Sequence, residues 1–115
     1  MRIQGSKVLV LGGYGMVGTA VCRELLERNP RELVIHSLRA EEAEEARDAL
    51  LREAGETRLT VASGDIFGRV GELSLRQRIR AQLKQLADED LAQFHLYQLL
   101  LETRPEFVVD CVNTA

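Results

Sequence analysis

The sequence predicts an α/β domain in which about four parallel strands form a sheet with helices on both faces. Three observations predict this fold. Short, continuous apolar runs are typical of strands that are buried on both faces of a sheet. Segments with helical periodicity lie between these runs, and a cluster of glycines joins the first run to the first helical segment. Strands that alternate with helices imply right-handed crossovers between parallel neighbours.

Four apolar runs are the expected strands: Val8–Leu11, Leu33–His36, Arg58–Ala62 and Phe107–Val112. The helix after the first strand is expected to bury Val17, Val21 and Leu25, which recur every fourth residue. Asn29-Pro30 is expected to end it, because the residue before a proline disfavours helical torsion angles.

The helix after the second strand is expected to cover residues 40–54. Its inward face is expected to carry Ala43, Ala46 and Leu50. Glutamates crowd its first turns, where the positive end of the helix dipole favours anions. Gly55 is expected to cap its C-terminus.

The segment 67–104 exceeds a short crossover and is expected to be a helical insertion before the fourth strand. Ser74 can cap one helix, and Asp88-Glu89-Asp90 can begin another that ends before Pro105. The insertion is expected to be a simple decoration, with a dimerisation surface or a partial lid as alternatives. Its charged residues are expected to be solvated.

Composition bounds the function of this chain of 115 residues, which we expect to be one domain. The net charge of −3 and the aromatic content of 4% argue against nucleic-acid binding, which needs clustered cations or stacking surfaces. No apolar run is long enough to span a membrane. Cys22 and Cys111 lack metal-ligand spacing and suit a reducing cytoplasm, and we expect them inside a helix and a strand.

The glycine cluster is the most informative segment. It comprises Gly12, Gly13, Tyr14, Gly15, Met16, Val17 and Gly18, between an expected strand and an expected helix. Glycine adopts the positive φ that a tight turn needs, and it lets backbone amides approach a pyrophosphate. The helix N-terminus then directs free amides at the phosphates. The alternative is a tight strand-to-helix turn without a ligand. Tyr14 either shields the phosphates or simply covers the turn.

Two glycine registers overlap in this segment. Gly13, Gly15 and Gly18 fit the general Rossmann dinucleotide fingerprint. Gly12, Gly15 and Gly18 have the spacing of the short-chain dehydrogenase/reductase superfamily, and the chain resembles especially its extended, epimerase-like branch. The resemblance implies that the chain is the N-terminal, NAD(P)-binding Rossmann portion of such an enzyme, over residues 1–115.

The end of the second strand bears on the choice of nucleotide. NAD-specific folds carry an acidic residue there, but this sequence reads His36-Ser37-Leu38-Arg39. Ser37 can accommodate a 2′-phosphate and Arg39 can pair with it, so we favour NADP over NAD. The alternative is that Ser37 caps the next helix and Arg39 is solvated. His36 alternates with core residues, and ordinary packing is expected for it.

The resemblance implies two further cofactor contacts. After the third strand, Asp65 would accept a hydrogen bond from the adenine amine and the Ile66 amide would donate to the ring, although Asp65 can instead cap a turn. After the fourth strand, Asn113, Thr114 and Ala115 would lie near the nicotinamide-side ribose or the diphosphate. Asp110 needs a partner if it is buried.

The superfamily's catalytic Tyr-x-x-x-Lys pair is absent, because Tyr97 is followed by Gln98-Leu99-Leu100-Leu101. We therefore expect a fragment of a longer oxidoreductase or epimerase, catalytically inactive by itself, whose complete form transfers a hydride at a carbonyl or alcohol carbon of a small molecule. One alternative is a saccharopine-dehydrogenase-like domain. The other is a nucleotide-sensing Rossmann module that forms a homodimer.

Overall fold

The computed structural model describes residues 2–66 and 95–112, which fall into two compact units. The larger unit comprises Met1–Gly64 and Thr103–Ala115. Its strands are β1 (Lys7–Leu11), β2 (Glu32–Ser37), β3 (Arg58–Ser63) and β4 (Phe107–Asp110). Its helices are α1 (Met16–Leu26), α2 (Ala40–Leu50) and the short 3-10 helix η1 (Leu51–Glu53).

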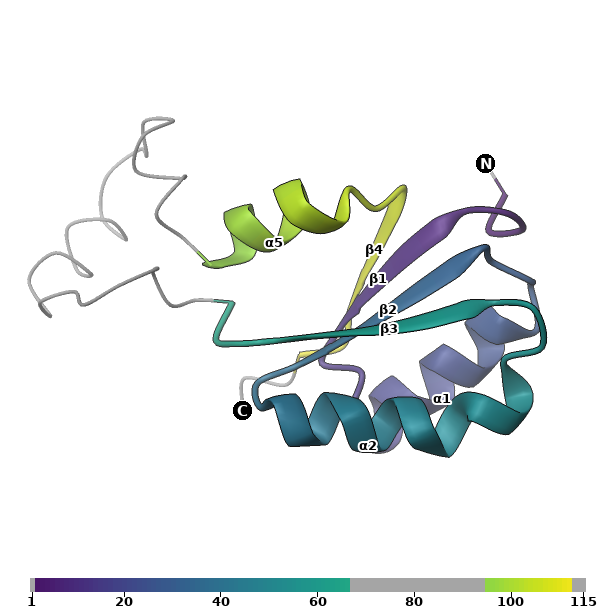
Figure 1. Ribbon diagram of the computed structural model, residues 1–115, viewed down its shortest axis with the longest axis horizontal. Helices are drawn as coiled ribbons and strands as arrows, with labels where there is room; N and C mark the ends of the chain where they lie inside the picture. The colour runs from purple at the N-terminus through teal and green to yellow at the C-terminus, as the bar shows by residue number, and fades with distance from the viewer. Residues whose placement is uncertain (1, 67–94, 113–115) are drawn as a thin grey trace, which may run out of the picture. The chain divides into compact units, whose positions relative to one another are not determined.

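The four strands form one parallel sheet in the order β3-β2-β1-β4 (Figure 1). The chain moves outward from β1 through β2 to β3, and β4 then pairs with the other side of β1. This reversal makes the carboxyl end of β1 a topological switch point, the place where open α/β sheets bind ligands. The prediction of a parallel α/β sheet is confirmed.

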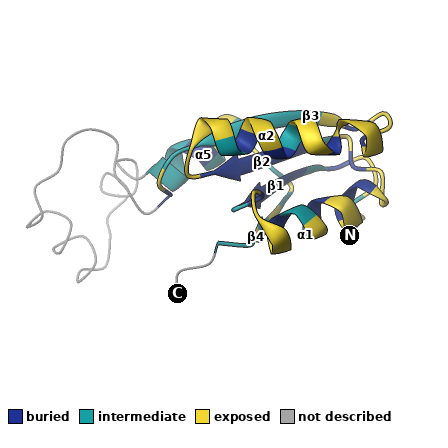
Figure 2. Ribbon diagram, turned by 90° about the horizontal axis from the view of Figure 1, so that it is seen from below, coloured by how far each residue is buried: buried dark blue, intermediate teal, exposed yellow. Residues whose placement is uncertain are grey.

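Helices α1 and α2 lie on the same face of the sheet and share one hydrophobic core with it (Figures 1 and 2). Side chains alternate between the two faces of a strand. Every second strand residue therefore enters this core, which contains Val8, Val10, Leu33, Ile35, Cys22, Leu25, Leu26, Ala46 and Leu50. Leu9 and Val34, between them, are buried on the opposite face. Burial on both faces explains the continuous apolar runs.

The predicted inward face of α1 is confirmed at Leu25 and at Val21, which packs against the core, but it is wrong at Val17. Val17 is 67% exposed, and the buried residues are Gly18, Cys22, Leu25 and Leu26. The reason is that Gly18 must face the sheet. A Cβ on Gly18 would lie 2.8 Å from both the Cα and the carbonyl carbon of Gly13, so only glycine fits there. That contact sets the rotation of the helix, and apolar periodicity cannot reveal it.

The second predicted helix is confirmed in its inward face and shortened at its end. Ala43, Ala46 and Leu50 are buried. The α-helix ends at Leu50, and η1 continues to Glu53. Gly55 then has φ +58°, which agrees with its predicted role in ending this helical segment.

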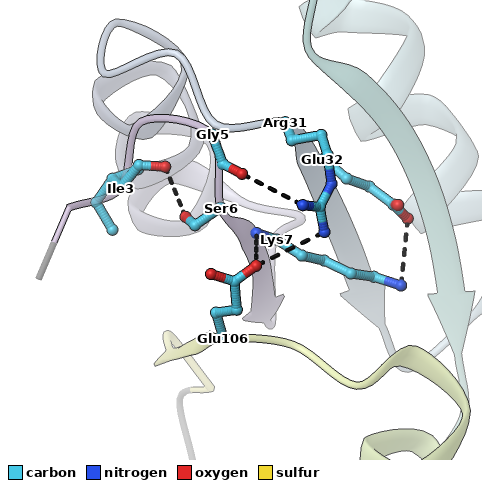
Figure 3. Close-up of polar contacts among 7 residues, drawn as sticks. All are labelled: Ile3, Gly5, Ser6, Lys7, Arg31, Glu32 and Glu106. Atoms are coloured by element: carbon cyan, nitrogen blue, oxygen red, sulfur yellow. Dashed lines mark hydrogen bonds and ion pairs between the residues drawn. The ribbon is translucent and has the colours of Figure 1, made fainter.

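A polar cluster joins the amino ends of β1, β2 and β4, at the edge remote from the glycines (Figure 3). The Glu106 carboxylate accepts a hydrogen bond from the backbone N–H of Lys7 at 3.3 Å and pairs with Arg31 at 3.6 Å. Lys7 Nζ lies 3.7 Å from a Glu32 oxygen. Exposed pairs such as Arg31–Glu106 each contribute about 0–1 kcal/mol. The cluster therefore contributes little to the stability of the fold.

The smaller unit, Asp65–Glu102, contains most of helix α5 (His95–Thr103). This helix ends before Pro105, as predicted for the last helix of the segment 67–104, and it buries Leu99. The helix predicted to begin at Ser74 lies outside the described residues. None of the described helices is long and apolar enough to cross a membrane.

Strand β4 is shorter than predicted, because it ends at Asp110. Asp110 is exposed, and its carboxylate accepts a hydrogen bond from the backbone N–H of Val112 at 2.9 Å. Because Asp110 is exposed, it does not need the partner that a buried carboxylate would require. Beyond the strand, the N–H of Cys111 still donates to the carbonyl oxygen of Leu11 in β1 at 2.8 Å.

Candidate functional site: a glycine loop at the switch point

The loop Gly12–Gly15, here called the glycine loop, connects the carboxyl end of β1 to α1. Gly12 has φ +71°, and a Cβ there would lie 3.0 Å from the carbonyl carbon and oxygen of Cys111. The loop therefore passes directly against the backbone that follows β4. A side chain at Gly12 would be strained by its φ and blocked by a backbone that cannot easily move.

Gly13 is held against β2. Its N–H donates to the carbonyl oxygen of His36 at 2.8 Å, and a Cβ would lie 2.7 Å from Cγ2 of Ile35. Gly18 likewise allows α1 to lie close to the glycine loop, since a Cβ at this position would overlap the carbonyl oxygen of Gly12. Three glycines thus bring β1, β2 and α1 close together around one turn.

Gly15 precedes the first residue of α1 and has φ +99° and ψ 178°, a conformation open essentially only to glycine. A Cβ there would meet nothing within 4 Å, so the space beside Gly15 is open. No side chain of the described residues caps the helix, and its first turn has no acidic residue. The hydrogen bonds of the helix begin with the backbone N–H of Thr19, which donates to the carbonyl oxygen of Gly15 at 3.0 Å.

The amides of Met16, Val17 and Gly18 therefore lie at an open helix N-terminus, where they and the helix dipole favour an anion. Met16 is 90% exposed, so its side chain does not cover them in the described structure. Tyr14 is 40% exposed beside them. Both interpretations of Tyr14, shielding of phosphates and cover of the turn, remain predictions.

The second predicted contact region lies between β2 and α2. Arg39 is the residue before the first turn of α2 and is exposed, and no carboxylate pairs with it among the described residues. Ser37 is the last residue of β2 and only 5% exposed. No side-chain hydrogen bond caps α2, so Ser37 is not the helix cap that was its alternative role. The first acidic residues are Glu41 and Glu42, inside α2.

Of the remaining predicted contact residues, the structure describes two. Asp65 is exposed and Ile66 is buried, and both belong to the smaller unit. Asn113, Thr114 and Ala115 lie outside the described residues. Cofactor roles for these residues stay predictions.

The sequence interpretation assigned only packing to His36, whereas the structure also gives its side chain a hydrogen bond. Its side chain is buried, and Nε2 lies 2.9 Å from the carbonyl oxygen of Gly64, just after β3. The signal that could have indicated this role is a polar residue that interrupts an apolar run at the carboxyl end of a strand. Such ends meet at the ligand-binding edge of a parallel sheet.

Both cysteines are free thiols. Burial raises the pKa of Cys22 to about 12, with a smaller contribution from Cys111. Burial also raises the pKa of Cys111, and the nearby Asp110 carboxylate raises it further. Because the thiolate is the reactive form, both residues are poor nucleophiles. Cys22 lies within α1 as expected, whereas Cys111 lies one residue beyond β4.

A parallel sheet in the order β3-β2-β1-β4, with a glycine loop and an uncapped helix at its switch point, defines a Rossmann-type dinucleotide-binding fold. The sequence profile of the KR domain family matches residues 6–90, and the chain belongs to that family. It is an NAD(P)-binding Rossmann portion of the short-chain dehydrogenase/reductase superfamily, as the resemblance predicted. None of the curated proteins matches the chain.

Several solved structures are similar to the chain. A putative dehydrogenase from Burkholderia cenocepacia with bound NADP is 21% identical over 58% of this chain and 26% of its own, with a TM-score of 0.49. An A-type ketoreductase from a modular polyketide synthase is 30% identical over 78% of this chain and 18% of its own, with a TM-score of 0.48. Pen from Bacillus thuringiensis is 14% identical over 96% of this chain and 39% of its own, with a TM-score of 0.53, and supports the fold alone. The chain thus spans between 18% and 39% of these proteins.

Proposed function

We propose that the chain binds NADP, with the pyrophosphate on the backbone amides of residues 14–17 at the N-terminus of α1. The N–H of Gly13, which the glycine motif also offered, donates to the carbonyl oxygen of His36 instead. The open N-terminus of α1 carries this proposal, because it has neither a side-chain cap nor an acidic residue in its first turn. Unsatisfied amides and the positive end of the helix dipole together favour an anion. The open space beside Gly15 gives a phosphate room to approach them.

The preference for NADP over NAD rests on the β2–α2 connection. Arg39 is exposed, without a carboxylate partner among the described residues, and its planar guanidinium can hold a 2′-phosphate by two hydrogen bonds. No acidic residue ends β2, so nothing there would select the unphosphorylated ribose. Ser37 is buried and adds no charge to this region. Its hydroxyl would contact the 2′-phosphate only if the residues around it moved apart.

The adenine would lie against Asp65 and Ile66, and the nicotinamide-side ribose against Asn113, Thr114 and Ala115. These positions follow from the resemblance to the short-chain superfamily, and the profile match to residues 6–90 includes the first pair. When bound, the cofactor supplies or accepts a hydride. The chain's own residues would bind and orient it.

In the longer protein, we propose hydride transfer between NADPH and the carbonyl or alcohol carbon of a small molecule, with catalytic residues from outside this chain. A sugar-nucleotide epimerase is the alternative, favoured by the spacing of Gly12, Gly15 and Gly18. The absence of a Tyr-x-x-x-Lys pair from the sequence is also compatible with a saccharopine-dehydrogenase-like domain or a nucleotide-sensing dimer.

Titration of the chain with NADPH and NADH, followed by nicotinamide fluorescence and calorimetry, tests the binding proposal. We expect both nucleotides to bind and NADPH to bind more tightly. Nicotinamide mononucleotide, which lacks the pyrophosphate and the adenosine, is the matched control and should bind much more weakly. A folded chain that shows no affinity for either dinucleotide would refute the proposal.

A further inference from the structure

His36 lies at the carboxyl edge of the sheet, where the glycine loop, the β2–α2 connection and the turn after β3 meet. Its backbone oxygen accepts the N–H of Gly13 in the glycine loop at 2.8 Å. Its ring Nε2 lies 2.9 Å from the carbonyl oxygen of Gly64 at the end of β3. The neighbouring carbonyl of Ser37 accepts the N–H of Gly64 at 3.1 Å. One dipeptide of β2 thus bonds both to the glycine loop and to the turn after β3.

The partner of the ring determines where its proton lies. A carbonyl oxygen can only accept a hydrogen bond, so Nε2 of His36 must carry the hydrogen. His36 is only 2% exposed, and a hydrogen bond in such surroundings is stronger than one in water. Loss of this donor would leave the Gly64 carbonyl without that bond.

Gly64, in the turn after β3, depends on hydrogen bonds to hold its position. It has φ +129°, outside the range that most residues adopt, and it lacks a side chain that could pack. Its N–H and carbonyl oxygen are instead held by Ser37 and His36. These two bonds hold the end of β3 beside the end of β2, where the proposed binding mode places the adenosine of the dinucleotide.

We propose that His36 is a positioning residue for the adenosine side of the cofactor, acting through the Gly64 carbonyl. This inference rests on the proposed function, because it assumes that a dinucleotide lies over the carboxyl edge of the sheet. The pyrophosphate site depends on the backbone oxygen of His36, which any residue provides. Only the adenosine side depends on the imidazole.

A pair of variants of equal side-chain length isolates the donor. In His36→Met the side chain is apolar, whereas in His36→Gln an amide N–H can still reach the Gly64 carbonyl. Adenosine 2′,5′-bisphosphate probes the adenosine side, and inorganic pyrophosphate probes the glycine loop alone. Val34→Ala is the matched control, because Val34 is also buried on β2, on the same face as His36, but has no polar side chain.

We expect His36→Met to weaken the bisphosphate by roughly fivefold to tenfold, the value of one hydrogen bond, and to leave pyrophosphate affinity close to that of the wild type. His36→Gln should restore most of the loss. Val34→Ala should lower the melting temperature without changing the ratio of the two affinities. An unchanged ratio in His36→Met, or an equal loss in His36→Gln, would overturn the inference while leaving the cofactor site intact.

Nuclear magnetic resonance of the wild-type chain labelled with ¹⁵N-histidine provides a test that needs no variant. We expect the neutral His36 ring to carry its proton on Nε2 and its signals to move with adenosine 2′,5′-bisphosphate but not with pyrophosphate. A proton on Nδ1 would overturn the inference, even if His36→Met fails to fold. A wild-type chain that binds neither probe would instead overturn the proposed function, and this inference with it.

Discussion

The glycines of the turn satisfy two physical requirements, close approach and an unusual backbone conformation, and Gly12 satisfies both. Gly12 and Gly13 allow close approach, since their missing side chains would contact the backbone of Cys111 and the side chain of Ile35. Gly15 instead has open space around it and is needed for its backbone conformation. The sequence motif identified all these glycines. Only the structure shows which of them is needed for close approach and which for its backbone conformation.

Gly15→Asp should abolish nucleotide binding, because it places a carboxylate beside the proposed phosphate position. The unusual backbone conformation makes any side chain at Gly15 cost about 1–3 kcal/mol of stability. Gly15→Asn has the same size and the same backbone strain without the charge, and it is the matched control. Calorimetric titration with NADPH should show a much larger loss for the aspartate variant. Equal affinities for the two variants would contradict a phosphate seat.

Arg39→Ala should weaken NADPH more than NADH by roughly 1–3 kcal/mol, the scale of a charge-assisted hydrogen bond. The expectation follows from the exposed position of Arg39 at the start of α2. Arg52→Ala, an exposed arginine in η1 at the far end of the same helical segment, controls for the change in net charge. Fluorescence titrations with both nucleotides measure the effect, and parallel losses for the two nucleotides would remove Arg39 from cofactor selection.

At the level of elements, the sequence located every strand of the sheet and both helices of the core, usually to within a few residues. It failed at the first turn of α1, where it placed Val17 inward. Apolar periodicity reports which residues are able to be buried. The contact of Gly18 with the backbone of Gly12 and Gly13 decides which residues are buried, and a residue without a side chain contributes nothing to a hydrophobic pattern.

Gly18→Ala should destabilise the fold by about 1–3 kcal/mol, because its Cβ would meet backbone atoms and push α1 away from the sheet. Gly55→Ala is the comparison, since Gly55 has φ +58° with nothing within 4 Å of a Cβ. That variant should lose about 1 kcal/mol from backbone strain alone. Urea denaturation gives both values. NADPH affinity should fall with Gly18→Ala and stay unchanged with Gly55→Ala; the reverse order would contradict close packing at Gly18.

At the level of the whole molecule, one core joins the sheet to α1 and α2, and Cys22 is fully buried within it. Burial of a thiol disfavours its ionised form and raises the pKa of Cys22 from 9.0 to about 12. In the unfolded chain the thiol ionises near its ordinary pKa. Its contribution to stability is therefore fully present below pH 9 and is lost as the pH rises towards 12.

The free energy of unfolding of the wild type should therefore fall more steeply between pH 9 and about 12 than that of Cys22→Ala. Other groups titrate in this range, but they are common to both proteins and cancel in the difference. Urea denaturation at a series of pH values measures it. Cys111→Ala, at a partly exposed thiol, should show a smaller difference. Identical slopes for the wild type and Cys22→Ala would contradict burial of the Cys22 thiol.

The sequence by itself determined the parallel α/β class, the order of elements and the glycine loop, because apolar runs, helical periodicity and glycine spacing are local properties of the chain. The tertiary structure decided three things: the rotation of α1, the short end of β4 at Asp110, and the bond from His36 to Gly64. Each depends on residues that meet only when strands pair. His36 and Gly64 are 28 positions apart, and only the register between β2 and β3 brings the ring to that carbonyl.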